Sequence, residues 1–290
     1  MRLFLLGLWA ALGSLLPVSS AQSAEVLRWK FVDGETIRYH LQHSVDMTTR
    51  VQGQDAKAKA LTALDVAWRL GAVGKDGSCT ITQTIERVRY AIRGRSARID
   101  YDSQRQYPND SLINSIRLPL EPLVGKELSF TMHPNGRVSD LQLSATLQTW
   151  LQAKAAAPTA RLSQSTLRYT FWHAPLVLPE VAVSTSDTWK SASKLELPWG
   201  PVESDRLMTL RDAEQIAERK LNVIDVASVE RTAKDTNRSV EESDQQTTGT
   251  VHFDNRAGRI NAYSDVAVDA DPQRKNAHSL RVTLIESHTR

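Results

Sequence analysis

The sequence predicts a mainly β protein with some α structure, arranged as a long antiparallel meander. Apolar and polar residues alternate with a period of two over most of the chain, and glycine-containing turn motifs separate the alternating runs. Such a meander is expected to form a curved sheet, a half-barrel or two packed sheets, accompanied by two or three short helices. The N-terminal and C-terminal parts are both expected to be β-rich.

The first long strand is expected after the Asp33-Gly34 turn, followed by a second strand that ends near Leu70. A turn at Gly74–Gly77 then leads into a third strand from Cys79 to Arg93. One face of the first strand would carry Ile37, Tyr39, Leu41, Val45, Met47 and Val51. Because alternate side chains point to opposite faces, this set predicts a strand that is buried on one side.

The third strand changes phase part-way along its length. Ile81 and Ile85 hold odd positions, whereas Val88 and Tyr90 hold even ones. A regular strand cannot place both sets on one face. Either a β-bulge lies near Glu86-Arg87, or the first part of the strand is buried on both faces. A bulge would add twist and curvature, which favours a curved sheet.

Three segments have helical patterns, at 108–123, 143–157 and 161–172. The first begins at the cap-like Asn109-Asp110 pair and is expected to end at the prolines Pro119 and Pro122, and the second begins at Ser144. Further strands are expected around 189–196, 203–211, 218–231, 247–254, 259–268 and 279–286. The order of these patterns divides the chain into an N-terminal β unit at 22–142, a helical connection at 143–178 and a C-terminal β unit at 179–290, which are expected to pack as one domain.

Residues 1–21 have the pattern of a secretory signal peptide. A short positive start is followed by an apolar run from Leu3 to Val18, and then by the small residues Ser19 and Ala21 at cleavage spacing. We therefore expect export through the secretory pathway to the periplasm or the extracellular space. No later stretch is apolar enough to cross a bilayer, so no membrane span is expected after cleavage.

Composition narrows the classes of partner and cofactor. The chain has 36 basic and 33 acidic residues, a formal net charge of +3, which does not indicate nucleic-acid binding. Cys79 is the only cysteine, so an internal disulfide and multi-thiolate metal sites are excluded. No metalloprotease, nucleophile-elbow, calcium-loop or phosphate-loop motif is present, and no metal or cofactor is therefore predicted.

Four arginines form the best candidate binding feature. Arg87, Arg89, Arg93 and Arg95 fall on one face of the third strand and could contact phosphate or acidic sugars, as a polyanion-binding site would. The alternative, which exposed charge generally favours, is a solvated face whose arginines pair with carboxylates of a neighbouring strand.

A second candidate lies in the stretch GTVHFDNRAGRI. His252 and Asp254 lie two apart, and a His–carboxylate pair could orient a general base, with His40 as a third group from another strand. The favoured alternative is geometric: Val251 and Phe253 point inward, His252 and Asp254 face water, and Asp254 caps the following turn.

Several short motifs together resemble a family of uncharacterised exported bacterial proteins, known as a domain of unknown function. The motifs are VDGETIRYHLQ, GKDGSCTITQTIERVRY, IDYDS, PLVGKELSFTMHPNGRV, LPEVAVSTSDTW and GTVHFDNRAGRI. Ser186 stands where members of this family usually carry glycine. The resemblance implies an exported β-rich protein and brings no catalytic residues. The arrangement is also similar to periplasmic lipoprotein carriers (LolA-like half-barrels), in which a curved sheet holds acyl chains.

These observations favour an exported, non-enzymatic protein that binds a lipid-like ligand or an envelope partner in the concave face of a curved sheet. Six tryptophans outside the predicted signal peptide could anchor the core or line an apolar cavity: Trp29, Trp68, Trp150, Trp172, Trp189 and Trp199. Two alternatives remain open. One is a hydrolase that uses His252 and Asp254, and the other is a structural component of a surface assembly, which a long exposed edge strand would support.

Overall fold

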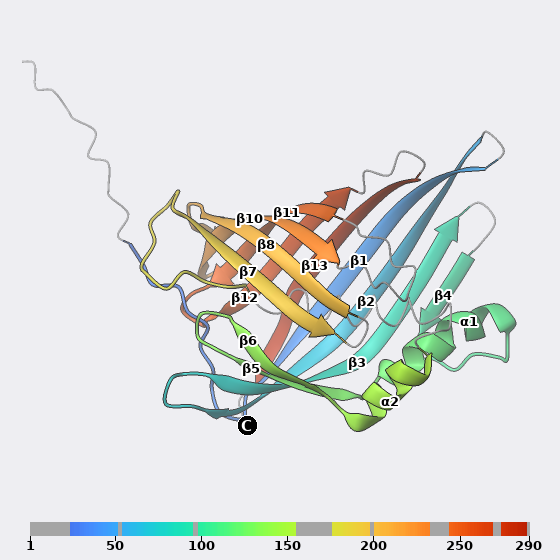
Figure 1. Cartoon of the computed structure of the whole chain (residues 1–290), viewed down its shortest axis with the longest axis horizontal. Helices are drawn as coiled ribbons and strands as arrows, with labels where there is room; N and C mark the ends of the chain where they lie inside the picture. The colour runs from blue at the N-terminus through green and yellow to red at the C-terminus, as the bar shows by residue number, and fades with distance from the viewer. Residues whose placement is uncertain are drawn as a thin grey trace, which may run out of the picture.

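The computed structural model describes residues 24–51, 54–94, 98–154, 176–197, 200–232, 244–268 and 274–288. The predicted signal peptide at 1–21 and the predicted helix at 161–172 lie outside these ranges. Within them the chain forms one large, curved, unclosed antiparallel sheet of 13 strands, accompanied by two short α-helices and a 3-10 turn (Figure 1). The predicted fold class is confirmed.

The strands are β1 (Thr36–Val51), β2 (Gln54–Val73), β3 (Cys79–Gly94), β4 (Arg98–Asp102), β5 (Glu127–Met132), β6 (Val138–Leu143), β7 (Thr188–Leu197), β8 (Gly200–Leu210), β9 (Glu214–Ile216), β10 (Arg219–Thr232), β11 (Asp244–Asp254), β12 (Arg259–Val268) and β13 (Arg274–His288). The helices are α1 (Ser111–Leu120) and α2 (Ala145–Lys154), and the 3-10 turn is η1 (Glu121–Leu123). The strand order is β6-β5-β3-β2-β1-β13-β12-β11-β10-β8-β7, with β4 beside β3 and β9 beside β10.

Two meanders make up the sheet, one from β1 to β6 and one from β7 to β13. They join where β1 pairs with β13, from Thr36 opposite His288 to Thr49 opposite Arg274. The first and last strands of the described sheet are therefore neighbours, and the main strand order ends at β6 and β7, with the short strands β4 and β9 lying beside it. The β1–β13 ladder therefore lies in the middle of the strand order, where it joins the two meanders, and we call it the seam.

The phase change in the third strand results from a β-bulge, which is the first of the two expected explanations. Asp65 of β2 lies opposite Arg87, while the next residue, Val66, lies opposite Ile85, so Glu86 has no partner in the ladder. The bulge lets the apolar residues on either side of Glu86 face the same side of the sheet, as far as Val88.

Both described helices begin at predicted caps. The Asp110 carboxylate accepts hydrogen bonds from the N–H groups of Leu112 and Ile113, at 2.8 and 2.9 Å. The Ser144 hydroxyl accepts one from Leu147 at the start of α2, at 3.4 Å. The helix ends between the two prolines, as expected. Pro119 lies in the last turn of α1, where a missing N–H removes only one helical hydrogen bond, and Pro122 lies in η1.

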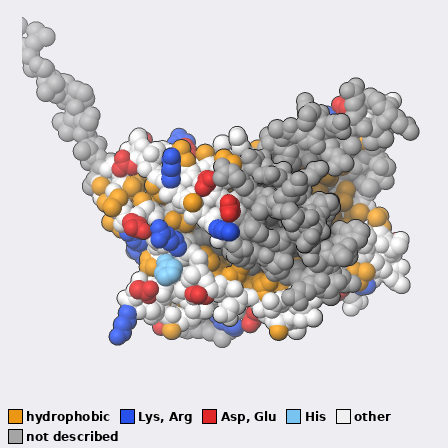
Figure 2. Space-filling model, viewed as in Figure 1, with side chains coloured by type: hydrophobic (Ala, Val, Ile, Leu, Met, Phe, Trp, Pro, Cys, Tyr) orange, Lys and Arg blue, Asp and Glu red, His pale blue; other side chains and the backbone are white. Residues whose placement is uncertain are grey.

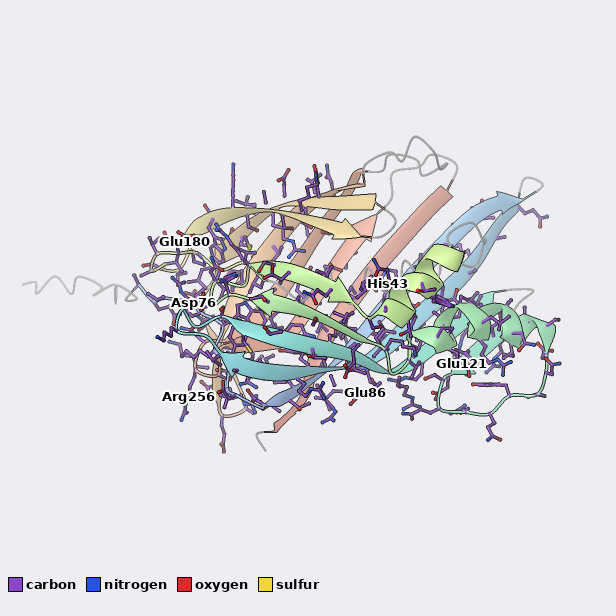
Figure 3. The ribbon with its side chains drawn as sticks, turned by 60° about the horizontal axis from the view of Figure 1, so that its bottom comes forward. His43, Asp76, Glu86, Glu121, Glu180 and Arg256 are labelled. Atoms are coloured by element: carbon purple, nitrogen blue, oxygen red, sulfur yellow. The ribbon has the colours of Figure 1, made fainter. Side chains whose placement is uncertain are left out.

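The core fills the inner face of the sheet, which is the face that carries the buried apolar residues. It is most densely aromatic at the end that we call the base, where the turns at 74–77, 133–136 and 254–258 lie. Trp68 packs against Phe130 with ring centroids 5.8 Å apart, and Trp29 packs against Phe253 at 5.7 Å. Figure 3 shows Asp76, Glu180 and Arg256 at this end of the molecule and Glu121 at the other.

An extended N-terminal segment, Glu25–Phe31, crosses the base, and we call it the strap. The Trp29 N–H donates to Pro134 of the β5–β6 turn at 2.8 Å, and the Lys30 N–H donates to Gly258 of the β11–β12 turn at 3.1 Å. The Trp29 indole N–H donates to the Leu176 carbonyl at 3.0 Å. The strap therefore links the two meanders at the base, independently of the β1–β13 seam.

A buried ion pair adds a second link near the base. Both terminal guanidinium nitrogens of Arg259, at the start of β12, donate to the Glu35 carboxylate just before β1, at 2.7 and 3.1 Å. Burial raises the pKa of the neighbouring Tyr39 phenol, and the Glu35 charge adds to this, while the Arg259 charge opposes it. Tyr39 therefore stays neutral beside the pair.

Candidate functional site

The predicted arginine face lies on the outer face of the sheet, opposite the core, and its first arginine is paired. The Arg87 Nε donates to Asp102 of β4 at 2.9 Å, and a second guanidinium nitrogen bonds the other carboxylate oxygen. These bonds are the main reason why the pKa of the Asp102 carboxyl lies below its ordinary value. The same contact raises the pKa of Arg87.

Arg89 is also paired with a carboxylate. Its guanidinium lies 3.2 Å from Asp65 Oδ1 and 3.2 Å from the Nδ1 of His40, while His40 Nδ1 lies 2.6 Å from the same Asp65 oxygen. Arg93 is exposed and lies in the ladder between Lys59 and Arg98. Arg95 lies outside the described residues. Polyanion binding by this face stays a prediction, because two of its four arginines already have acidic partners.

The His252 and Asp254 pair is not joined by a hydrogen bond in the described structure. His252 Nε2 lies 3.3 Å from Glu214 of β9, whereas Asp254 Oδ1 accepts from the Ala257 N–H at 2.9 Å and so caps its own turn. The expected cap is confirmed, and Val251 and Phe253 are buried as expected. The expectation that Asp254 faces water was wrong: its exposed fraction is 7%, because the turn folds onto the strap.

His40, the suggested third group, shares a row with His252 but is far from it. Across the outer face the ladder runs from His252 on β11 through Ala262 and Thr283 to His40 on β1. Three interstrand spacings of about 4.8 Å separate the two histidines by roughly 14 Å. The hydrolase interpretation gains no convergent third group from this geometry and stays a prediction.

The inner face is divided into an apolar area and a polar area. The sequence did not reveal this division. The apolar arm consists of half-buried, inward-facing residues of β1–β3: Val45, Met47, Ala58, Ala60, Tyr90 and Ile92. The polar arm consists of inward-facing residues of β7–β11: Ser191, Ser193, Ser204, Arg206, Ser228 and Thr247. Period-two alternation identifies which residues face inward, but only the long-range strand order places these two sets in one concavity.

Burial along β1 shows where the packed core ends. Ile37, Tyr39 and Leu41 are 2%, 4% and 5% exposed, whereas Val45 and Met47, on the same face, are only half-buried. In the space-filling view, charged side chains of both signs lie over the left part of the visible face, with hydrophobic side chains between them (Figure 2). Beyond Leu41 the inner face passes the buried polar pair His43 and Thr62 and then continues as the half-buried apolar residues Val45 and Met47.

A shallow groove of about 490 Å³ lies mainly on the outer face of the second meander. Its lining combines small residues with two exposed apolar ones, Leu207 and Val266. Thr250 and Arg211 lie at 3.3 and 3.7 Å from Asp225, an acidic residue of the lining. This groove faces away from the two arms of the inner face.

Two further findings concern metal sites and membrane spans. Among the described residues, no three His, Cys, Asp or Glu side chains are grouped so that they could hold a metal ion. No helix in the described part of the chain combines the length and the apolar character that a transmembrane helix requires.

The sequence matches no protein-family model and no curated protein sequence. Among solved structures, a structure of lipid–protein interactions in lipovitellin aligns with 90% of this chain and 26% of its own, at 9% identity and a TM-score of 0.49. The translocator domain of the autotransporter NalP from Neisseria meningitidis aligns at 10% identity over 87% and 88% of the two chains, with a TM-score of 0.33. A protein described as exported, with a YmcC-like fold, from Bacteroides fragilis aligns at 6% identity over 91% and 99%, with a TM-score of 0.27. This chain spans about a quarter of the lipovitellin chain, and none of these TM-scores reaches the level that would establish a shared fold.

Proposed function

We propose that this protein is an exported, non-enzymatic binding protein that holds a lipid-like ligand against the inner face of its curved sheet. The observation that carries the proposal is the burial gradient on β1, from the packed residue Leu41 to the half-buried residues Val45 and Met47. Binding sites for small ligands are concave and mostly apolar, and half-buried apolar residues in a concavity gain free energy when a ligand covers them. Export is supported by the signal-peptide pattern at 1–21.

Two adjacent residues of β3 provide a matched test. Ile92 faces inward on the apolar arm, and Ala91 is its neighbour on the outer face. The mature protein, purified from its native host, should carry lipid that mass spectrometry detects. Ile92→Asp should remove most of this lipid because a carboxylate would lie against the apolar chain, whereas Ala91→Asp should retain it. The thermal midpoint of each variant is measured so that unfolding is not mistaken for lost binding.

Two results would contradict parts of this proposal. If the wild-type protein carries no lipid and binds no long-chain compound added in solution, the lipid-binding function is wrong. If both variants lose lipid equally while remaining folded, the ligand does not lie on the inner face.

A second candidate, a structural component of a surface assembly, is favoured by β7. This strand has ten residues and lies at one end of the main strand order formed by the described residues. Exposed edges can pair with a strand of another chain. This candidate predicts concentration-dependent oligomers in sedimentation velocity, and a monomer at every concentration would exclude it.

A further inference from the structure

The ladder register places polar and apolar residues in one continuous row across the inner face. From β7 to β4 the row reads Ser191, Arg206, Ser228, Thr247, Ala267, His278, Val45, Ala60, Ile92 and Ile99. The row begins with hydroxyl and guanidinium groups and ends with aliphatic side chains. The two arms are therefore parts of one surface, and the seam between β1 and β13 joins them (Figure 1).

Buried hydroxyls give the polar arm unused hydrogen-bonding capacity. Ser228 and Thr247 are 6% and 8% exposed, and their hydroxyl oxygens are hydrogen-bonded to each other. Ser204 is 3% exposed, and its hydroxyl accepts from the Arg206 Nε at 3.3 Å. Each hydroxyl can donate one hydrogen bond and accept two, so one mutual bond leaves both donor and acceptor positions on the Ser228–Thr247 pair. A polar group of a ligand could therefore bond the pair without displacing the bond between the two hydroxyls.

The boundary between the arms is polar but already satisfied. Asp265 of β12 accepts from the Tyr263 hydroxyl at 2.7 Å and from the Leu280 N–H at 3.2 Å. Its exposed fraction is 8%. A ligand group that crosses from one arm to the other would therefore pass a carboxylate whose hydrogen bonds are made within the protein.

From this division we infer that the ligand is a single amphiphile. Its acyl chain lies against the apolar arm, and its oxygen-rich head lies against the hydroxyls of the polar arm. The inference rests on the proposed function and narrows its ligand class. A carboxylate, a phosphate diester and a sugar share the relevant chemistry, since each presents oxygen atoms to hydroxyl donors.

The test compares ligands with and without a head. Palmitate, lysophosphatidylglycerol, dodecyl maltoside and hexadecane are titrated into the delipidated mature protein by calorimetry or by displacement of a fluorescent fatty acid. Thr247→Val removes an inner-face hydroxyl without changing the side-chain volume much, and Thr248→Val makes the same change on the exposed outer face. Thr247→Val combined with Ser228→Ala should weaken binding of at least one headed ligand by about 2–10-fold per lost hydrogen bond and leave hexadecane unchanged. Thr248→Val should change neither.

The outcomes separate this inference from the proposed function. If the wild-type protein binds none of the four compounds, the proposed function itself fails. If it binds hexadecane as tightly as every headed ligand, and the inner-face variants alter nothing, only the amphiphile assignment fails. The headed ligand that binds most tightly, and that loses most affinity in the inner-face variants, identifies the head chemistry. Thermal midpoints of all variants establish that they are folded.

Discussion

At the scale of single residues, alanine substitutions at two glycines allow the stability cost of backbone strain to be compared with the added cost of a steric clash. Gly34 and Gly258 both have positive φ, at 74° and 66°. A Cβ at Gly34 would meet nothing within 4 Å, whereas one at Gly258 would lie 2.4 Å from the backbone nitrogen of Lys30 in the strap. We expect Gly34→Ala to lower the free energy of unfolding by about 1–2 kcal/mol, from strain alone. Gly258→Ala should cost about 3–5 kcal/mol, because strain and overpacking add.

Urea unfolding of both glycine variants measures this difference. Equal losses would show that the strap moves away from the β11–β12 turn without cost, which contradicts the contact between Lys30 and Gly258.

Asp102 predicts a specific pH dependence of stability. Because Arg87 lowers the pKa of the folded carboxyl from its ordinary value of 3.8, ionised Asp102 stabilises the protein above about that pH. This stability is lost as the pH falls through the lowered folded pKa. Asp102→Asn should therefore cost about 1–3 kcal/mol at neutral pH, and the difference from wild type should shrink in acid. Unfolding free energies from pH 7 down to pH 2 test this.

Asp100 is the control for that experiment. It lies on the same short strand and outer face, but it is exposed. Asp100→Asn should change stability little at any pH. A wild-type-to-Asp102→Asn difference that stays constant from neutral to strongly acidic pH would disprove the role assigned to the ion pair.

Asp102 alternates with the buried residues Ile99 and Tyr101, so the sequence pattern alone would place its carboxylate on a solvated strand face, whereas it is 3% exposed. Its burial could not be predicted, because it depends on β4 folding back on β3 and bringing the carboxylate beside Arg87. That pairing spans an interval of 15 residues and leaves no periodic signal.

At the scale of the elements, alternation predicted the later strands well, with β12 at Arg259–Val268 matching the expected range. β9 was missed, since its three residues are all exposed and show no alternation. The strand order and the edges were also unpredictable, because the β1–β13 seam joins residues more than two hundred positions apart.

The bulge in β3 determines which single-residue deletions this strand tolerates. Without Glu86, a regular strand would still place Ile85 and Val88 on the inner face, because only the extra residue is lost. Deletion of Glu86 should therefore give a folded protein that loses local curvature and one surface ion pair with Arg38, the latter worth at most about 1 kcal/mol.

Deletion of Thr82 provides the matched contrast. To keep both Ile81 and Val88 inward, the shortened strand would have to lose its bulge, turn Ile85 outward and place Glu86 inside, which would bury an unpaired charge at a cost above about 4 kcal/mol. Circular dichroism and urea unfolding should show a cooperative transition for the first deletion and none for the second. Similar behaviour of the two deletions would contradict the bulge assignment.

At the scale of the whole molecule, the strap and the seam connect the two meanders at different places. The seam is a long ladder with one register shift, between Arg38 and Tyr39. The strap is held by the buried side chain of Leu27 and by hydrogen bonds of Arg28 and Lys30, and also by Trp29. Trp29 is 3% exposed and packs on both Trp68 and Phe253. Trp68 belongs to the first meander and Phe253 to the second. Loss of this indole should therefore affect both meanders at the base together.

Trp29→Ala should lower the free energy of unfolding by about 3–5 kcal/mol, because it leaves a cavity among aromatic rings. Hydrogen exchange should accelerate in the β5–β6 turn and in the β11–β12 turn to a similar degree, since the strap bonds both Pro134 and Gly258. Val26→Ala, a change at a strap residue that is 50% exposed, should leave both turns protected. If Trp29→Ala accelerated exchange in only one turn, the strap would belong to that meander alone, and the β1–β13 seam would be the principal connection between the two halves of the sheet.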